Sequence, residues 1–166
     1  MSYDMILKRR SIRKYTGQPL SPEDLRRLLD AAMAAPSANN RKPWHFVTVT
    51  QRETLDKLAE AHPYGKMLSG AAAAIAVCGD TNTAPDYWVQ DCSASTENIL
   101  IAAASLGLGT CWLGCHPREE RVSAIKKILG IPPEINVLSL ISIGQPGEEK
   151  EPRTQYDESR DHREKW

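Results

Sequence analysis

The amino-acid sequence predicts one α+β domain in which helices cover a central sheet. Helical periodicity recurs in several segments of the 166-residue chain, and short aromatic or β-branched runs lie between them. The two kinds of segment alternate without forming a regular strand–helix–strand series, which favours layered α+β architecture. Apolar residues make up 41% and charged residues 25% of the chain, which suits an ordinary globular protein with one core.

The N-terminal part of the chain predicts two helices. The first runs from Ser2 into a cluster of cations. The second begins after Ser21, a natural N-cap, and Pro22 suits its first position. Asp24 supports a capping box at this end, and Pro36 ends the helix.

The middle of the chain predicts two strands and two helices. Residues 44–50 are aromatic and β-branched and predict a strand, and residues 52–61 predict an amphipathic helix. Residues 71–80 are almost entirely apolar and predict a strand covered on both faces. The longest helical pattern covers residues 86–106, and its apolar second half predicts a buried central helix that Gly107 caps.

The last third predicts a strand, a helix and a strand before the composition changes. Residues 110–115 predict a short strand, Pro117 opens a helix that Gly130 stops, and residues 135–144 predict the final strand. Residues 145–166 contain almost no aliphatic side chains. Such a segment cannot form its own core, so it is either disordered or laid over a partner surface.

Charge and hydropathy exclude several classes of protein. The 21 basic and 21 acidic side chains balance, and a pI near 6.9 argues against a dedicated nucleic-acid binder. The N-terminal residues lack the apolar run of a signal peptide, and no stretch approaches the roughly 18 apolar residues of a membrane span. A cytoplasmic protein is therefore expected.

Common metal-binding and catalytic motifs are missing from the sequence. The four cysteines form no CxxC pair and no zinc-finger spacing with histidine, so we expect no metal site and four reduced, mostly buried thiols. The GLG at residues 107–109 is no dinucleotide fingerprint, and neither a phosphate loop nor a GxSxG elbow occurs. No histidine has a nucleophile beside it in sequence, so no catalytic side chain is nominated.

Two segments have the composition of binding sites. The run KRRSIRKY, residues 8–15, places five cations within seven residues around Ser11, and arginine binds phosphate through paired hydrogen bonds. The run APSANNRKPWHF, residues 35–46, places small and amide side chains between a helix and a strand, where backbone can approach a flat ring. A solvated basic turn and a plain helix-to-strand turn are the alternatives.

In order and spacing, the sequence resembles the nitroreductase family of FMN-dependent NAD(P)H oxidoreductases. The resemblance runs nearly end to end and is carried by RRSIRKY, APSANNRKPWHF, DYWVQDCSASTENILIAAASLGLGTCWLG and PRTQYDESRDHREKW. It implies a single domain over residues 1–166, a three-layer sandwich whose central, mainly antiparallel sheet is flanked by helices. It also implies a homodimer with FMN at the subunit interface, residues 145–166 wrapping the partner.

The resemblance also implies roles for individual residues. Arg9 and Ser11 would hold the FMN phosphate or ribityl chain, with Arg10 beside them and Arg153 helping to neutralise the charge. Arg13 would reach the N1–O2 edge of the flavin ring, and Lys66 would lie near its pyrimidine edge. Residues expected at the partner's flavin are Pro36, Ser37, Ala38 and Asn40, and those expected near N5 and O4 are Trp112, Leu113 and Gly114.

Two residues depart from the family pattern. Lys42 stands where the family usually has glutamine before Pro-Trp, which removes an amide from that position. Gln155 stands where the C-terminal segment commonly has a second basic residue. Phosphate binding is therefore expected to depend more on Arg9 and Arg153.

The implied activity needs no catalytic side chain, because the cofactor supplies the chemistry. Hydride would pass from NADH or NADPH to flavin N5, and electrons would then pass to a nitroaromatic, quinone or similar small acceptor in a ping-pong cycle. Specialised family activities, namely dehalogenation, dehydrogenation or flavin cleavage, are alternatives. A non-catalytic FMN-binding protein and a nucleic-acid-binding module are two more, and the latter leaves the neutral remainder of the chain unexplained.

Overall fold

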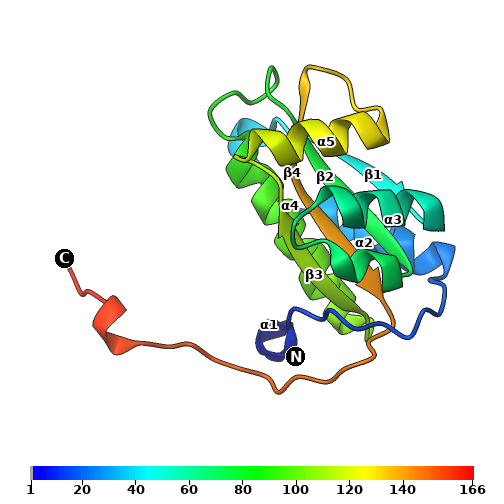
Figure 1. Ribbon diagram of the computed structural model, residues 1–166. Helices are drawn as coiled ribbons and strands as arrows, with labels where there is room; N and C mark the ends of the chain where they lie inside the picture. Colours follow the sequence, from blue (N-terminus) through cyan, green and yellow to red (C-terminus); the bar gives the residue numbers. More distant parts are fainter. Residues whose placement is uncertain (1) are drawn as a thin grey trace.

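The computed structural model describes residues 2–166 and has a four-stranded sheet between two layers of helices (Figure 1). The helices are α1 (Ser2–Lys8), α2 (Pro22–Met33), α3 (Arg52–Ala61), α4 (Trp88–Ser105) and α5 (Glu119–Leu129), with short 3₁₀ turns η1 (Ala38–Asn40), η2 (Lys66–Gly70) and η3 (Glu158–Arg160). The strands are β1 (Trp44–Val49), β2 (Ala73–Asp80), β3 (Gly109–Gly114) and β4 (Ile135–Gly144). The predicted α+β three-layer fold is confirmed.

The sheet is antiparallel, with the strand order β1-β2-β4-β3. The two central strands are buried on both faces because their side chains alternate between two cores. Ile75 and Ile141 face α2 and α4, whereas Ala76 and Leu140 face α3 and α5. The near-continuous apolar runs predicted from the sequence therefore serve two helical layers at once.

Helix α4 is the predicted buried central helix. Its buried residues run along its whole length, from Trp88 to Ala103, and pack against the sheet and α2. Gly107 follows the helix with a φ of 74°, the left-handed conformation that glycine adopts without a Cβ clash.

Local signals place most helix ends correctly. The Ser21 hydroxyl accepts the Asp24 backbone N–H at 3.0 Å and contacts its carboxylate at 2.8 Å, as a capping residue should. Two proline-based boundaries are wrong. Helix α2 ends at Met33, three residues before Pro36. Helix α5 begins at Glu119, with Arg118 as its N-cap, two residues after Pro117.

The segment after α1 lies along the outer edge of β3. Ser11 forms an isolated parallel bridge with Thr110, and the Ile12 N–H donates to the Thr110 carbonyl at 2.8 Å. The Tyr15 hydroxyl contacts the Ile12 carbonyl at 2.8 Å and the Ser142 hydroxyl at 2.7 Å. These contacts tie the basic run to both edge and centre of the sheet.

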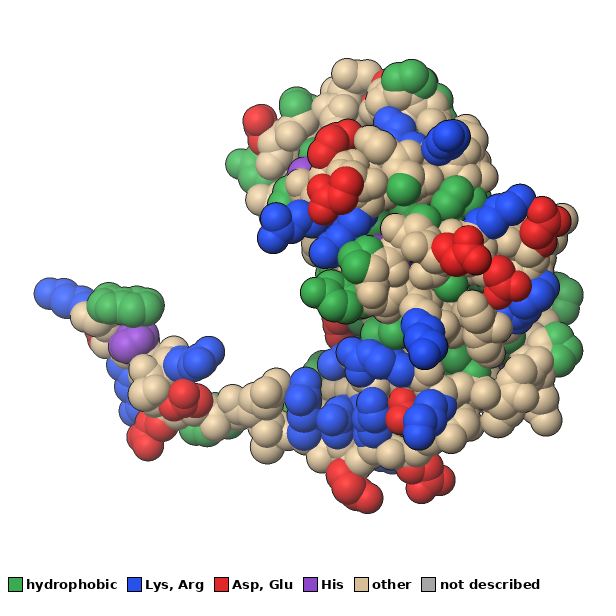
Figure 2. Space-filling view, in the orientation of Figure 1, with side chains coloured by type: hydrophobic (Ala, Val, Ile, Leu, Met, Phe, Trp, Pro, Cys, Tyr) green, Lys and Arg blue, Asp and Glu red, His purple; other side chains and the backbone are tan. Residues whose placement is uncertain are grey.

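The C-terminal segment divides at about Glu151. Residues 145–150 pack on the chain itself, where the Thr16 N–H donates to the Gln145 carbonyl and the Gly147 N–H to the Lys14 carbonyl. Residues 151–166 are exposed throughout. The first of them still contact the body through Glu151 and Arg153, and the rest extend away from it (Figures 1 and 2). The change in composition at residue 145 thus precedes the point where the chain leaves its own surface. In the part described, no helix is both long and apolar enough to cross a membrane.

We expect Gly109→Ala to destabilise the fold, because an added Cβ would lie 2.7 Å from Cγ2 of the buried Ile12. The segment after α1 would have to shift, and the free energy of unfolding from urea titration should fall by about 1–3 kcal/mol. Gly70→Ala is the matched control, since nothing lies within 4 Å of its added Cβ. Equal losses for the two variants would contradict this packing.

Candidate functional site

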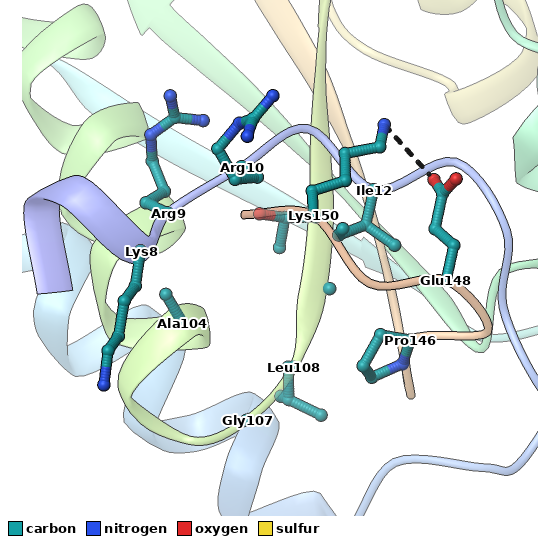
Figure 3. A pocket seen from close by; sticks show the side chains of 12 residues that line it. Lys8, Arg9, Arg10, Ile12, Ala104, Gly107, Leu108, Pro146, Glu148 and Lys150 are labelled. Carbon is teal, nitrogen blue, oxygen red and sulfur yellow. Dashed lines mark ion pairs between the residues drawn. The ribbon is translucent and has the colours of Figure 1, made fainter. Parts of the chain in front are cut away.

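The basic run does not form a single cluster in the folded chain. Figure 3 shows the guanidinium groups of Arg9 and Arg10 and the amine of Lys150 on one side, whereas Lys8 points the opposite way. These four residues line a hollow of about 170 Å³ whose floor comes from the end of α4 and the start of β3. Lys8 is therefore separated from the cations that follow it.

Arg9 and Arg153, which the resemblance assigns to the phosphate, lie on one hollow beside α1. They line a hollow of about 260 Å³ together with Gln155. Nε of Arg9 lies 3.4 Å from the carboxylate of Glu97 on α4, and the Arg153 N–H donates to the Leu7 carbonyl at 3.2 Å. Burial raises the pKa of Glu97, and the charge of Arg9 opposes that rise. An incoming anion would compete with Glu97 for Arg9.

Lys150, which lines the first hollow with Arg9 and Arg10, is a cation that sequence reasoning missed. Its Nζ donates to the Ser11 carbonyl at 2.7 Å and lies 3.4 Å from the Glu148 carboxylate (Figure 3). Arg10 donates from Nη1 to the Glu151 carbonyl. Both contacts bring residues 148–151 against the basic run, although about 140 positions separate the partners in sequence. Only the lysine's position shortly before Arg153 could have indicated it.

Arg13 faces a different opening, between η2 and β3. It lines a cleft of about 380 Å³ with other predicted site residues, namely Lys66, Trp112, Leu113 and Gly114. An adjoining hollow of about 490 Å³ shares Arg13 and Lys66. Within residues 2–166 neither cation forms an ion pair, and no carboxylate lines either opening. Glu148 contacts Arg13 only at the backbone, where its carboxylate accepts the Arg13 N–H at 2.7 Å. The two cationic side chains are therefore left to interact with a ligand anion in the cleft.

The outer edge of β3 gives this cleft backbone donors. Because the Thr110 carbonyl accepts the Ile12 N–H on that edge, the alternate residues Trp112 and Gly114 present their N–H and C=O groups to the same side. The bridge to the basic run ends at Thr110. Beyond it, the amides of Trp112 and Gly114 face the cleft.

The Gly114 carbonyl is held by two side chains that sequence reasoning missed. Nε2 of His62 and Nη1 of Arg121 each lie 3.0 Å from this oxygen. The Tyr64 N–H donates to Nδ1 of His62 at 3.2 Å, so the proton of the neutral ring is on Nε2. The Arg121 guanidinium also lies over the Tyr64 ring, 5.5 Å from its centroid.

The environment of His62 favours its neutral form. Burial lowers the pKa of His62 most, the hydrogen bond to Gly114 acts in the opposite direction, and the charge of Arg121 lowers it further. A histidine whose folded pKa is lowered contributes stability above its ordinary pKa. That contribution is lost as the pH falls through the interval down to the folded value.

The predicted loop at Pro36, Ser37, Ala38 and Asn40 does not join this cleft within one chain. None of these residues lines the two openings that Arg13 lines. The Ala38 N–H donates at 2.9 Å to the buried Asp91 carboxylate near the start of α4. Asn40 has a φ of 56°, and Lys42, with a φ of 50°, donates its N–H to the Ser37 hydroxyl at 3.0 Å.

The cysteines are free and buried, as predicted. Burial raises the pKa of Cys78, Cys92 and Cys115 to about 12, so these thiols are protonated near neutral pH. Burial also raises the pKa of Cys111, and Arg13 and Lys150 oppose that rise. No group of three potential metal ligands occurs among the residues that the structure describes.

The geometry suits binding of a planar, anionic ligand. Cations lie beside open backbone amides and the half-exposed ring of Trp112, whereas no nucleophile and base are paired in the cleft. Chemistry at this site would therefore come from the bound molecule, with the chain supplying position and charge.

Comparisons with known proteins agree with this architecture. The model of the nitroreductase family matches residues 6–62 and 62–145. A provisionally named NADH dehydrogenase/NAD(P)H nitroreductase of Archaeoglobus fulgidus is 52% identical over 98% of this chain and 97% of its own length.

Two solved structures extend the likeness to the fold. An FMN-dependent nitroreductase from Clostridium difficile R20291 superposes with a TM-score of 0.93, at 31% identity over 99% of each chain. A nitroreductase-like protein of Desulfovibrio desulfuricans, solved in complex with FMN, gives 0.80 at 30% identity over 92% of this chain and 91% of its own. By family match, sequence identity and shared fold, the chain belongs to the nitroreductase family.

Proposed function

We propose that the protein is an FMN-dependent oxidoreductase that takes hydride from NADH or NADPH and passes electrons to a small acceptor. The observation that carries the proposal is the cleft of Arg13 and Lys66, two cations whose side chains form no ion pair within residues 2–166 and lie beside the open amides of β3. The names of its relatives, an NAD(P)H nitroreductase and an FMN-dependent nitroreductase, support the same reaction class.

The residues present fit FMN. Arg13 and Lys66 would lie at the pyrimidine side of the ring, and the amides near Trp112, Leu113 and Gly114 would donate to its N5–O4 edge. Arg9, Arg10, Ser11 and Arg153 would hold the phosphate and ribityl chain. Lys150, whose amine lies on the same side as Arg9 and Arg10, would replace the basic residue that Gln155 removes from the family pattern.

The chain's own residues bind and orient, and the flavin supplies the hydride-accepting ring when it is bound. A cation at the pyrimidine edge stabilises negative charge there. At about 4 Å and an effective dielectric of about 20, one such charge contributes about 4 kcal/mol before desolvation is subtracted. The exposed face of Trp112 leaves one side of the cleft open to a nicotinamide or an acceptor.

Nitroaromatics and quinones are the acceptor class we propose, in a ping-pong cycle in which the oxidised nicotinamide leaves before the acceptor binds. Because the cleft is open on one side, the nicotinamide and the acceptor would occupy the same place in turn. The second candidate is an FMN-binding protein without turnover, which the absence of a paired acid and base in the cleft equally allows.

Purified protein should bind one FMN per chain, and NADH or NADPH should reduce the bound flavin in anaerobic stopped-flow experiments. A nitroaromatic or a quinone should then reoxidise it. Chromatography of the released cofactor should give FMN rather than FAD, because no dinucleotide fingerprint is present. Failure of both nicotinamides to reduce the bound flavin would leave the non-catalytic candidate.

Arg9 and Arg13 should have separable roles. For Arg9→Ala we expect mainly weaker FMN binding, by about 1.5–3 kcal/mol for one lost charge-assisted contact. Arg13→Ala should mainly lower the flavin's midpoint potential and slow its reduction. Fluorescence titration measures the first quantity, and spectroelectrochemistry the second.

Lys150→Ala tests the proposed role of Lys150 in phosphate binding. Lys8→Ala is its matched control, since Lys8 points away from the other cations. Only the Lys150 variant should behave like Arg9→Ala. If Arg9→Ala and Arg13→Ala changed affinity and potential equally, the two assigned roles would be wrong.

We also propose a homodimer in which each loop at residues 36–40 completes the partner's flavin site. Large apolar side chains on α1 and α2 are exposed in the single chain, with 65% of Tyr3, 52% of Ile6 and 54% of Met33 accessible. The extended tail has two more, Tyr156 at 74% and Trp166 at 100%. Aromatic anchors of this kind are enriched in interfaces, and obligate dimers bury more than about 2,000 Å².

Light scattering of the FMN-loaded protein should give twice the 18.4 kDa of one chain. A chain that ends at Arg153 keeps the proposed phosphate ligands but lacks the tail aromatics. Its dimer dissociation constant should therefore be larger than that of the full chain, and FMN should be lost as the dimer dissociates on dilution. A mass of one chain with flavin still bound would overturn the shared-site arrangement.

A further inference from the structure

His62 and Arg121 converge on one backbone atom at the edge of the cleft. Each donates to the Gly114 carbonyl at 3.0 Å, from α3's C-terminal end and from α5 respectively. Gly114 is the last residue of β3, beyond the bridge that holds Thr110. The peptide unit that carries this carbonyl is held on its other side by the Cys115 N–H, which donates to the Leu138 carbonyl at 2.9 Å. The two side chains add restraint on the outer side, at a glycine that has the backbone freedom to turn.

We infer that His62 and Arg121 are positioning residues that hold the Gly114 N–H toward the reactive edge of the bound ligand. The inference rests on the proposed function for the identity of that ligand, a flavin whose N5–O4 edge accepts the hydrogen bond. The N–H and C=O of Gly114 belong to successive peptide units that point to the same edge of the strand, so holding the carbonyl restrains the rotation at Gly114 that would disorder this end of the strand and turn the amide away. His62 also lines the cleft, whereas Arg121 does not.

The surroundings of the two side chains suit a rigid support. His62 is 2% exposed and uses both ring nitrogens, Nε2 on Gly114 and Nδ1 on the Tyr64 N–H. Nε of Arg121 is buried and has no hydrogen-bond partner within residues 2–166, and its guanidinium lies over Tyr64. Arg121 also forms no ion pair in that part of the chain. The hydrogen bond from Nη1 of Arg121 to the Gly114 carbonyl is therefore its main polar contact, unlike that of a surface arginine held by an ion pair.

Two amide substitutions separate the two contacts of His62. His62→Gln can keep a donor near the Nε2 position and so retain the bond to Gly114. His62→Asn can keep an acceptor near Nδ1, and so retain the bond from Tyr64, but it does not reach Gly114. Arg121→Lys and Arg121→Ala form a second pair, in which only lysine keeps a donor and the charge.

The test compares these variants without and with FMN. In flavin-free protein, the ¹³C shift of the Gly114 carbonyl should move upfield in His62→Asn and Arg121→Ala and stay near the wild-type value in His62→Gln. On addition of FMN, the Gly114 amide proton should shift strongly only where that carbonyl is held. Reduction of bound flavin by NADH should slow about three- to tenfold in His62→Asn, the loss expected for one hydrogen bond, with FMN affinity changed less than about twofold.

Recovery of the carbonyl shift and the rate in His62→Gln and Arg121→Lys supports the inference. Equal behaviour of His62→Gln and His62→Asn in both the shift and the rate would overturn it, as would an unperturbed Gly114 carbonyl in Arg121→Ala. If wild-type flavin is bound but not reduced by either nicotinamide, the proposed activity fails. The Gly114 carbonyl and amide shifts then still decide whether the two residues position that amide.

Discussion

The pairing between the segment after α1 and the outer edge of β3 is the interaction on which the candidate site depends. The Ile12 N–H reaches the Thr110 carbonyl at 2.8 Å, and the Tyr15 hydroxyl reaches Ser142 on β4 at 2.7 Å. Burial raises the pKa of Tyr15, and the hydrogen bond with Ser142 opposes that rise, so the hydroxyl stays protonated near neutral pH. Without these contacts the flanking arginines would be a solvated turn. With them, Arg9 and Arg13 lie along one sheet edge.

The sheet order explains why a binding cleft forms at this edge. An edge strand exposes unpaired backbone groups, which folded proteins usually cover. The chain covers β3 with its own N-terminal segment as far as Thr110 and leaves Trp112 to Gly114 facing the cleft. The same backbone groups that would promote aggregation on a long exposed strand become donors for a ligand. The shortness of β3, six residues, limits the exposed edge to that end.

Local sequence signals predicted the helices and the strands. The resemblance to the family, not a local signal, placed Arg13, Lys66 and residues 112–114 at one site, and in the folded chain these residues line one cleft. Periodicity, an N-cap hydroxyl and apolar runs act over a few residues, so they can be read along the chain. The individual roles in cofactor binding stay predictions. Lys150, Asp91, His62 and Arg121 were not found, because their contacts join residues 7 to 139 positions apart and leave no local pattern. Proline misplaced two helix ends, since it is compatible with several positions around a helix terminus.

Helix α4 explains why the loop at residues 36–40 lies apart from the cleft of its own chain. Asp91 holds the loop at residues 36–40 near the start of the helix, and Glu97 contacts Arg9 farther along. Six residues of α-helix separate these two positions by about 9 Å along the axis and by about a third of a turn around it. Because α4 is buried against the sheet, the loop and the basic run are held on different sides of a rigid element. The loop therefore does not reach the cleft of its own chain. In the proposed homodimer, two-fold symmetry would let each loop reach the cleft of the partner.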